Sequence, residues 1–277
     1  AGPTAPDWLG PLYAGVVGAF TLVLGSRYVQ PRRQQAGLVV TLATEALIKL
    51  VAMLVVGTAI LIEAFGGIEG LVAWTREHPE VLDQMMSTGH RPQFPMVVVL
   101  AGLAAFLLPR QFHVAFVERP DERSLTHAMW TLPLFLLLLN LPVLAVLWGG
   151  QVLVPDVAPD LYLVAASSNP VLRLLALMGG VAASSAMILV GSIALSGMVV
   201  THLVVPLRSS GLGPAAISRY RRLGMVFVVA VAFLAHLLLP RAGTLVDLGL
   251  ASFAAVSQLA PGVLLGHFWE RATARGV

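Results

Sequence analysis

The chain has 277 residues, of which 57% are hydrophobic and only 11% are charged, with a formal net charge of +3. Soluble domains carry about 25% charged residues, so this composition excludes an ordinary soluble domain and indicates a membrane protein. The complete absence of cysteine excludes disulfides, thiolate metal sites and cysteine nucleophiles.

Seven apolar stretches follow one another along the chain. Each is roughly long enough for a helix across a bilayer, which needs about 20 apolar residues. The alternating pattern of membrane β-strands is not seen. We therefore predict an all-α membrane protein, a single transmembrane domain over 1–277, with seven spans at 8–26, 36–62, 92–109, 124–155, 174–207, 223–240 and 248–269.

The basic residues predict the orientation of these spans. Eleven arginines fall in connections on one side of the predicted membrane, and four fall on the other. The arginine-rich side of a membrane protein faces the cytoplasm. We expect a multi-pass protein of the bacterial cytoplasmic membrane, with its N-terminus outside and its C-terminus inside. Because the arginines are dispersed over loops, no nucleic-acid partner is expected.

The connections between spans carry turn chemistry. Residues 66–93 form the longest polar loop, for which we predict a short helix around 73–86. Asn140 and Pro142 predict a kink in the fourth span. Residues 151–170 contain three prolines and predict an irregular cap. Residues 209–222 end in a basic cluster that is typical of a headgroup anchor.

Glu45 and Lys49 are four residues apart inside the second span. This spacing places both side chains on one helix face in the order that favours an intrahelical ion pair. Such a pair would fix the rotation of the helix within the bundle. The alternative is a role of both residues in an ion or proton path, because ionisable groups at membrane depth are costly and often functional.

The segment FLLPRQFHVAFVERPDER (106–123) places a proline and polar residues in an apolar stretch. Pro109 lacks a backbone donor, so we predict a break or kink near 105–108. Arg110, Gln111 and His113 would then line a hydrated solute path beside the freed carbonyls. The alternative is that Pro109 only ends a short span and Arg110 extends toward lipid headgroups.

The fifth span contains GGVAASSAMILVGSIALSGM (179–198), which is dense in small residues. Small residues allow close helix packing, and this is the simpler interpretation. The hydroxyls of Ser184 and Ser185 are also candidates for an ion path. His202 and His236 are expected to be structural.

Four stretches resemble the sodium/solute symporter family, and in particular the branch that forms the membrane half of bacterial sensor histidine kinases. They are GLVVTLATEALIKLVAMLVVG (37–57), FLLPRQFHVAFVERPDER (106–123), GGVAASSAMILVGSIALSGMVV (179–200) and FAAVSQLAPGVLLGHFWERATARG (253–276). The resemblance implies a partial inverted-repeat, LeuT-like fold, in which these spans are core helices four to ten. It also implies that the first core helices, which complete the binding site, are missing from this fragment.

The resemblance further implies recognition, and possibly transport, of a small polar solute, an amino acid such as histidine, coupled to Na⁺ or H⁺. A kinase module would follow in the full-length protein, and no other cofactor is implied. The sodium-binding hydroxyls of the family fall on Ala182 and Ala183 rather than on Ser184 and Ser185, which weakens the case for sodium. A plain secondary transporter and a non-transporting scaffold are the alternatives. We expect no enzyme activity, because no metal-ligand or nucleophile-base motif occurs.

Overall fold

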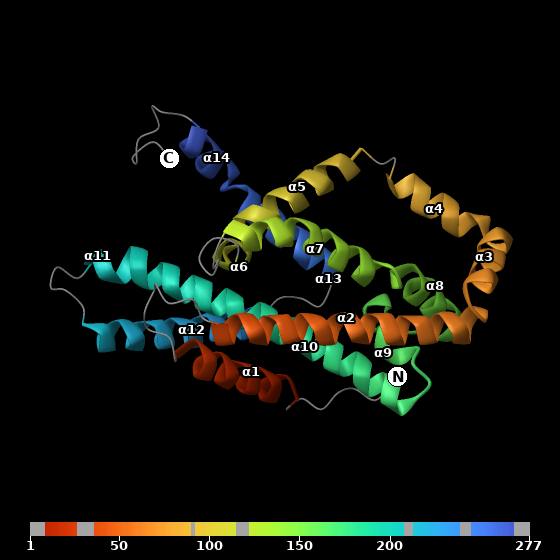
Figure 1. Cartoon of the computed structure of the whole chain (residues 1–277), viewed down its shortest axis with the longest axis horizontal. Helices are drawn as coiled ribbons and strands as arrows, with labels where there is room; N and C mark the ends of the chain where they lie inside the picture. The colour runs from red at the N-terminus through yellow and green to blue at the C-terminus, as the bar shows by residue number, and fades with distance from the viewer. Residues whose placement is uncertain are drawn as a thin grey trace. The chain divides into compact units, whose positions relative to one another are not determined.

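The computed structural model describes residues 9–26, 36–89, 92–114, 122–207, 213–238 and 245–268. Within these residues the chain is helical with short turns and contains no strand, which confirms the all-α prediction (Figure 1). The helices are α1 (Leu9–Ser26), α2 (Ala36–Phe65), α3 (Ile68–Glu77), α4 (Pro79–Gly89), α5 (Phe94–Leu107), α6 (Pro109–Phe112), α7 (Glu122–Asn140), α8 (Val143–Leu153), η2 (Pro159–Leu161), α9 (Tyr162–Ala165), α10 (Pro170–Val199), η3 (Val200–Val204), α11 (Val205–Leu207), α12 (Pro214–Leu238), α13 (Leu245–Ser257) and α14 (Ala260–Phe268).

Five helical segments of the described chain are long and apolar enough to cross a membrane. They are Gly37–Phe65, Thr126–Leu153, Pro170–Leu207, Pro214–Leu238 and Val246–Val263. In these segments between 6% and 39% of the most apolar stretch is buried within the chain, so most of their apolar side chains are free to face lipid. The other two predicted spans form the shorter apolar helices Pro11–Val23 and Phe94–Leu107, and the seven-helix arrangement stays a prediction.

Prolines interrupt several of these helices. The kink predicted in the fourth span is present, because α7 ends at Asn140 and α8 begins after Pro142. A second interruption, between α13 and α14, was not predicted. Pro261 lies in the first turn of α14, where its missing N–H removes a hydrogen bond of the preceding turn. Pro133, by contrast, lies inside the continuous helix α7.

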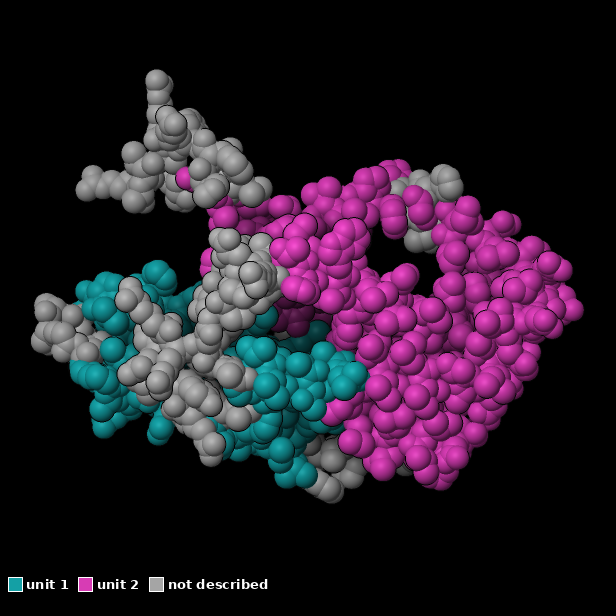
Figure 2. Space-filling view, viewed as in Figure 1, with its two compact units in different colours: residues 1–47, 113–125, 181–241 teal, residues 48–112, 126–180, 242–277 magenta. Residues whose placement is uncertain are grey.

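The chain divides into two compact units, which Figure 2 shows in different colours. Unit 1 comprises residues 1–47, 113–125 and 181–241, and unit 2 comprises residues 48–112, 126–180 and 242–277. The boundaries cut α2 after Leu47 and α10 after Gly180, so these two helices contribute to both units.

Unit 1 is built around a small apolar core. Leu38 of α2, Leu189 and Ile193 of α10 and Met225 of α12 are buried together, and Leu22 of α1 packs against them. Glycine allows a close helix contact here, because a Cβ at Gly224 would lie 3.0 Å from the Cβ of Ser196. α1, α2, α10 and α12 therefore form one packed group.

Unit 2 has a core made mainly by α2, α8 and the segment before α10. Val56 and Ile60 of α2 are buried with Val146 of α8, Tyr162 of α9 and Ala176 of α10. The segment 151–170, predicted as an irregular cap, supplies Tyr162 to this core and includes a short 3₁₀ turn and the helix α9. The cap is thus part of the core and not only a surface loop.

The polar loop after α2 forms two short helices, α3 and α4, instead of the one predicted. Gly66 and Gly67 have φ of 72° and 124°, which glycine adopts readily, and they turn the chain sharply at the end of α2. Pro79 is the first residue of α4. At this position the missing N–H costs nothing, because the first N–H groups of a helix have no partner within the helix. Figure 1 shows both helices following the end of α2.

An aromatic cluster fixes α3 to the rest of unit 2. The ring of Trp74 lies 4.5 Å from that of His78, 5.4 Å from that of Phe65 and 6.0 Å from that of Trp148, measured between centroids. Trp148 is 6% exposed. Aromatic pairs at these separations stabilise a fold by more than the burial of their surface alone would.

We expect Trp74→Ala to lower the free energy of unfolding by about 2 kcal/mol, below the 3–5 kcal/mol of a fully buried tryptophan because Trp74 is half-buried. Thermal unfolding in detergent, followed by circular dichroism, measures this loss. Trp130→Ala is the matched control, since Trp130 is 80% exposed. Equal losses from the two substitutions would contradict the role of the cluster.

Candidate functional site

Glu45 is the most deeply buried acidic residue among those that the structure describes. It lies on α2 in unit 1 and is 9% exposed. Its Oε1 atom is 2.9 Å from the hydroxyl of Ser185 on α10. Its Oε2 atom is buried and has no hydrogen-bond partner. A buried polar atom without a partner is uncommon and calls for a physical explanation.

Lys49 does not supply that explanation, because it forms no ion pair with Glu45. Its ammonium lies 5.5 Å from the centre of the Phe135 ring, in a cation–π contact within unit 2. The predicted ion pair between the two residues is therefore wrong. Helix spacing allows such a pair, but the carboxyl of Glu45 turns instead toward the serine of a neighbouring helix.

The two adjacent serines of α10 contact two different helices of unit 1. The hydroxyl of Ser184 is hydrogen-bonded to the phenol of Tyr13 on α1, and that of Ser185 is hydrogen-bonded to Glu45 on α2. Successive residues of an α-helix point about 100° apart, so neighbours in the sequence meet different partners. Glu45, Ser184 and Ser185 are thus brought together, and Tyr13 joins them. Tyr13 was not among the predicted residues, since a lone tyrosine in an apolar span gives no signal.

Some of the remaining small and hydroxylated residues of α10 serve packing. Buried Ser196 donates to the carbonyl of Ile193 at 3.1 Å, within its own helix turn. In unit 2, a Cβ at Gly179 would lie 2.6 Å from the Cβ of Ala52 on α2. The packing interpretation of the small residues therefore holds for these positions.

The helix break at Pro109 is present where the sequence predicts it. α5 ends at Leu107, Leu108 is extended with φ −62° and ψ 127°, and α6 begins at Pro109. The residue before a proline avoids the helical region, which explains the conformation of Leu108. The N–H of Leu108 still bonds to the carbonyl of Ala104, and that of Phe112 to Leu108.

The three residues predicted to line a solute path follow this break. Arg110 is half-buried and Gln111 is exposed on α6, at the end of the first segment of unit 2, residues 48–112. His113 is half-buried and belongs to unit 1. Their role in a solute path stays a prediction.

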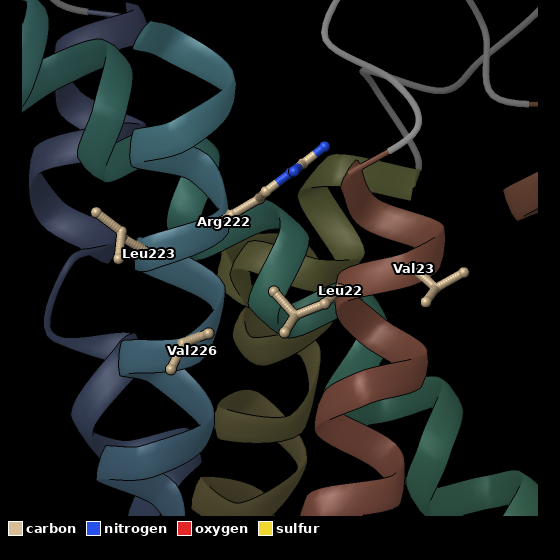
Figure 3. Close-up of a pocket in the computed structure, with 5 residues that line it drawn as sticks. All are labelled: Leu22, Val23, Arg222, Leu223 and Val226. Carbon is tan, nitrogen blue, oxygen red and sulfur yellow. The ribbon is translucent and has the colours of Figure 1, made fainter. Parts of the chain in front are cut away.

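An open groove of about 310 Å³ lies between α1 and α12 in unit 1. Figure 3 shows Leu22 of α1 and Val226 of α12 pointing toward each other, while Val23 and Leu223 point outward. Arg222 is the fifth lining residue and the single charged one. Arg110, Gln111 and His113 do not line it, and its apolar walls offer little to a polar solute.

The two histidines expected to be structural lie on exposed positions. His202 lies in η3, a single π-helical turn that continues α10, and His236 lies in the last turn of α12, 6.5 Å from the ring of Phe233. Among the described residues, no three His, Asp or Glu side chains gather in a way that would hold a metal ion.

No family model, no curated protein and no solved structure matches this chain. The resemblance to sodium/solute symporters therefore stays a prediction. The buried carboxyl of Glu45 and the helix break at Pro109 are the two features of the described residues that point to a function.

Proposed function

We propose that this chain is the membrane domain of a symporter-like protein that recognises a small polar solute, an amino acid such as histidine, and couples its binding to an ion. In this proposal the domain lies in the bacterial cytoplasmic membrane, with its N-terminus outside. Solute occupancy feeds a sensor kinase signal. The chain itself carries out no covalent chemistry.

The observation that carries the proposal is the interrupted helix at Leu108. An interruption in an apolar helix frees backbone carbonyls, which is tolerated at membrane depth only against protein or in a wet cavity. Half-buried Arg110 and the amide of Gln111 follow at once. Together they offer donors and acceptors to a carboxylate-bearing solute, as broken helices do in secondary transporters.

The buried carboxyl of Glu45 gives independent support. A charged group at the centre of a membrane costs at least about 2.5 kcal/mol, so an acidic residue retained there usually serves an ion or proton path. A protein that only spans or scaffolds a membrane has no need of it. If solute binding is coupled to an ion, Glu45 would serve as part of the path of that ion.

The purified chain in lipid nanodiscs, titrated with radiolabelled histidine and other amino acids, tests the proposal. We expect saturable binding, and we expect Arg110→Ala to weaken it by at least about tenfold, or about 1.4 kcal/mol. Arg76→Ala is the matched control, because Arg76 is an exposed arginine on α3. Absence of saturable binding of any small polar solute would favour a structural role.

A further inference from the structure

We propose that Glu45 is a proton-binding site and that the arrangement with Ser185 holds its carboxyl in the protonated, neutral form. The coupling ion is then H⁺ and not Na⁺. This inference rests on the proposed function for its use in coupling, but the protonation itself is independent of any solute.

The hydrogen-bond geometry carries the argument. The hydroxyl oxygen of Ser185 is 2.9 Å from Oε1 of Glu45 and 3.2 Å from the carbonyl oxygen of Ala182. A serine hydroxyl has one hydrogen to donate and can also accept. With an ionised carboxylate, that one hydrogen is shared between two acceptors, and Oε2 carries charge with no partner.

A proton on Oε1 resolves this conflict. The carboxyl then donates to the hydroxyl of Ser185, and Ser185 donates its own hydrogen to the carbonyl of Ala182. Oε2 becomes the oxygen of a neutral acid, for which the lack of a partner costs far less free energy than it does for a buried charge. The neutral form therefore satisfies the buried polar atoms better than the ionised form does.

In the part of the chain that the structure describes, no cation is paired with the carboxyl of Glu45. Among the described residues, Ser185 is the only hydrogen-bond partner of its carboxyl. Lys49, on the same helix, contacts Phe135. The other titratable or charged residues of unit 1 whose side chains the structure describes are Tyr13 on α1, His113, His202 in η3, and Arg219, Tyr220, Arg221, Arg222 and His236 on α12. Of these, Tyr13 is hydrogen-bonded to Ser184, the neighbour of Ser185.

The donor set also fits a proton better than a sodium ion. One carboxyl and one hydroxyl meet at this position, and that hydroxyl is already engaged by the carbonyl of Ala182. A hard cation requires several oxygen ligands around it, usually including carbonyls released from a helix. Residues 170–199 are continuous α-helix, so the carbonyls of this turn keep their helical bonds.

Infrared spectroscopy of the full chain in lipid bilayers tests the inference, since a protonated carboxylic acid has a carbonyl stretch of its own. We expect this band at neutral pH and its loss in Glu45→Gln. Glu63→Gln is the matched control: Glu63 lies on the same helix and accepts from Ser168 at 2.9 Å, but it is exposed. The control is expected to retain the band. We also expect Ser185→Ala to shift the band to higher frequency, because the acid loses its partner, and this variant serves if Glu45→Gln does not fold.

The outcomes separate this inference from the proposed function. A band that survives in Glu45→Gln without loss, or is unshifted in Ser185→Ala, would overturn the assignment. So would disappearance of the band when sodium is added at constant pH. If the band behaves as expected but no solute binds, the proton site stands and the solute function falls. If solute binds and the band is absent, the solute function stands and the proton site falls.

Discussion

Gly179→Ala is expected to destabilise the protein by about 1–3 kcal/mol, the usual cost of forcing an extra methyl group into a packed contact. The added Cβ would lie 2.6 Å from the Cβ of Ala52, well inside the contact distance of about 3.5–4.0 Å between carbon atoms. Neither atom is at the end of a flexible side chain, so α2 and α10 must move apart within unit 2. Thermal unfolding in detergent measures the loss.

Gly180→Ala is the control for this prediction, because it makes the same chemical change one residue further along α10. A Cβ at Gly180 meets nothing within 4 Å. Alanine is favoured over glycine in a helix by about 1 kcal/mol, so this variant should be neutral or slightly stabilised. Similar destabilisation of both variants would show that the contact with Ala52 does not limit packing.

Pro109→Ala is expected to join α5 and α6 into one continuous helix and to abolish solute binding. Alanine restores an N–H that can bond to the carbonyl of Ala105, and it lifts the restriction on Leu108. The change favours the continuous helix by about 3 kcal/mol. Because the arrangement of Arg110 and Gln111 depends on the break, we expect at least about a tenfold loss of solute affinity.

The chain has no cysteine, so the helix geometry can be measured with two introduced spin labels. Val98 and Phe112 are 54% and 45% exposed and accept labels at either end of the break. A straight helix separates their backbones by about 21 Å, at 1.5 Å per residue, and Pro109→Ala should approach this value with a narrow distribution. Pro133→Ala is the control, since α7 is already continuous there. An unchanged distance distribution in Pro109→Ala would contradict this prediction.

The local features of the fold could be predicted where one residue type dictates the backbone. Pro109 and Pro142 both end or begin helices as expected, because each lacks a backbone N–H, whereas Pro133 is accommodated inside the continuous helix α7. Pro261 acts as Pro109 does, but it lies in the apolar run 248–269, which the sequence predicts as one span. Apolar length alone also could not distinguish the five long segments from the shorter α1 and α5.

The candidate site could be predicted only in part. Glu45, Ser184 and Ser185 stand out in the sequence because polar groups are costly at membrane depth. Their partners do not. Helix periodicity pairs Glu45 with Lys49, four residues away, whereas the structure pairs it with Ser185, 140 residues away. Tyr13 and Ser184 are 171 residues apart. Such contacts depend on tertiary packing, which a single sequence does not disclose.

Ser184 and Ser185, which are adjacent on α10, contact two different helices, α1 and α2. Because they are rigidly attached about 100° apart, a turn of α10 about its own axis shifts both hydroxyls at once. The acid of α2 and the phenol of α1 would then lose or regain their contacts in step. If Glu45 binds a proton as proposed, a rotation of α10 on gain or loss of that proton would also change the contact between Ser184 and Tyr13.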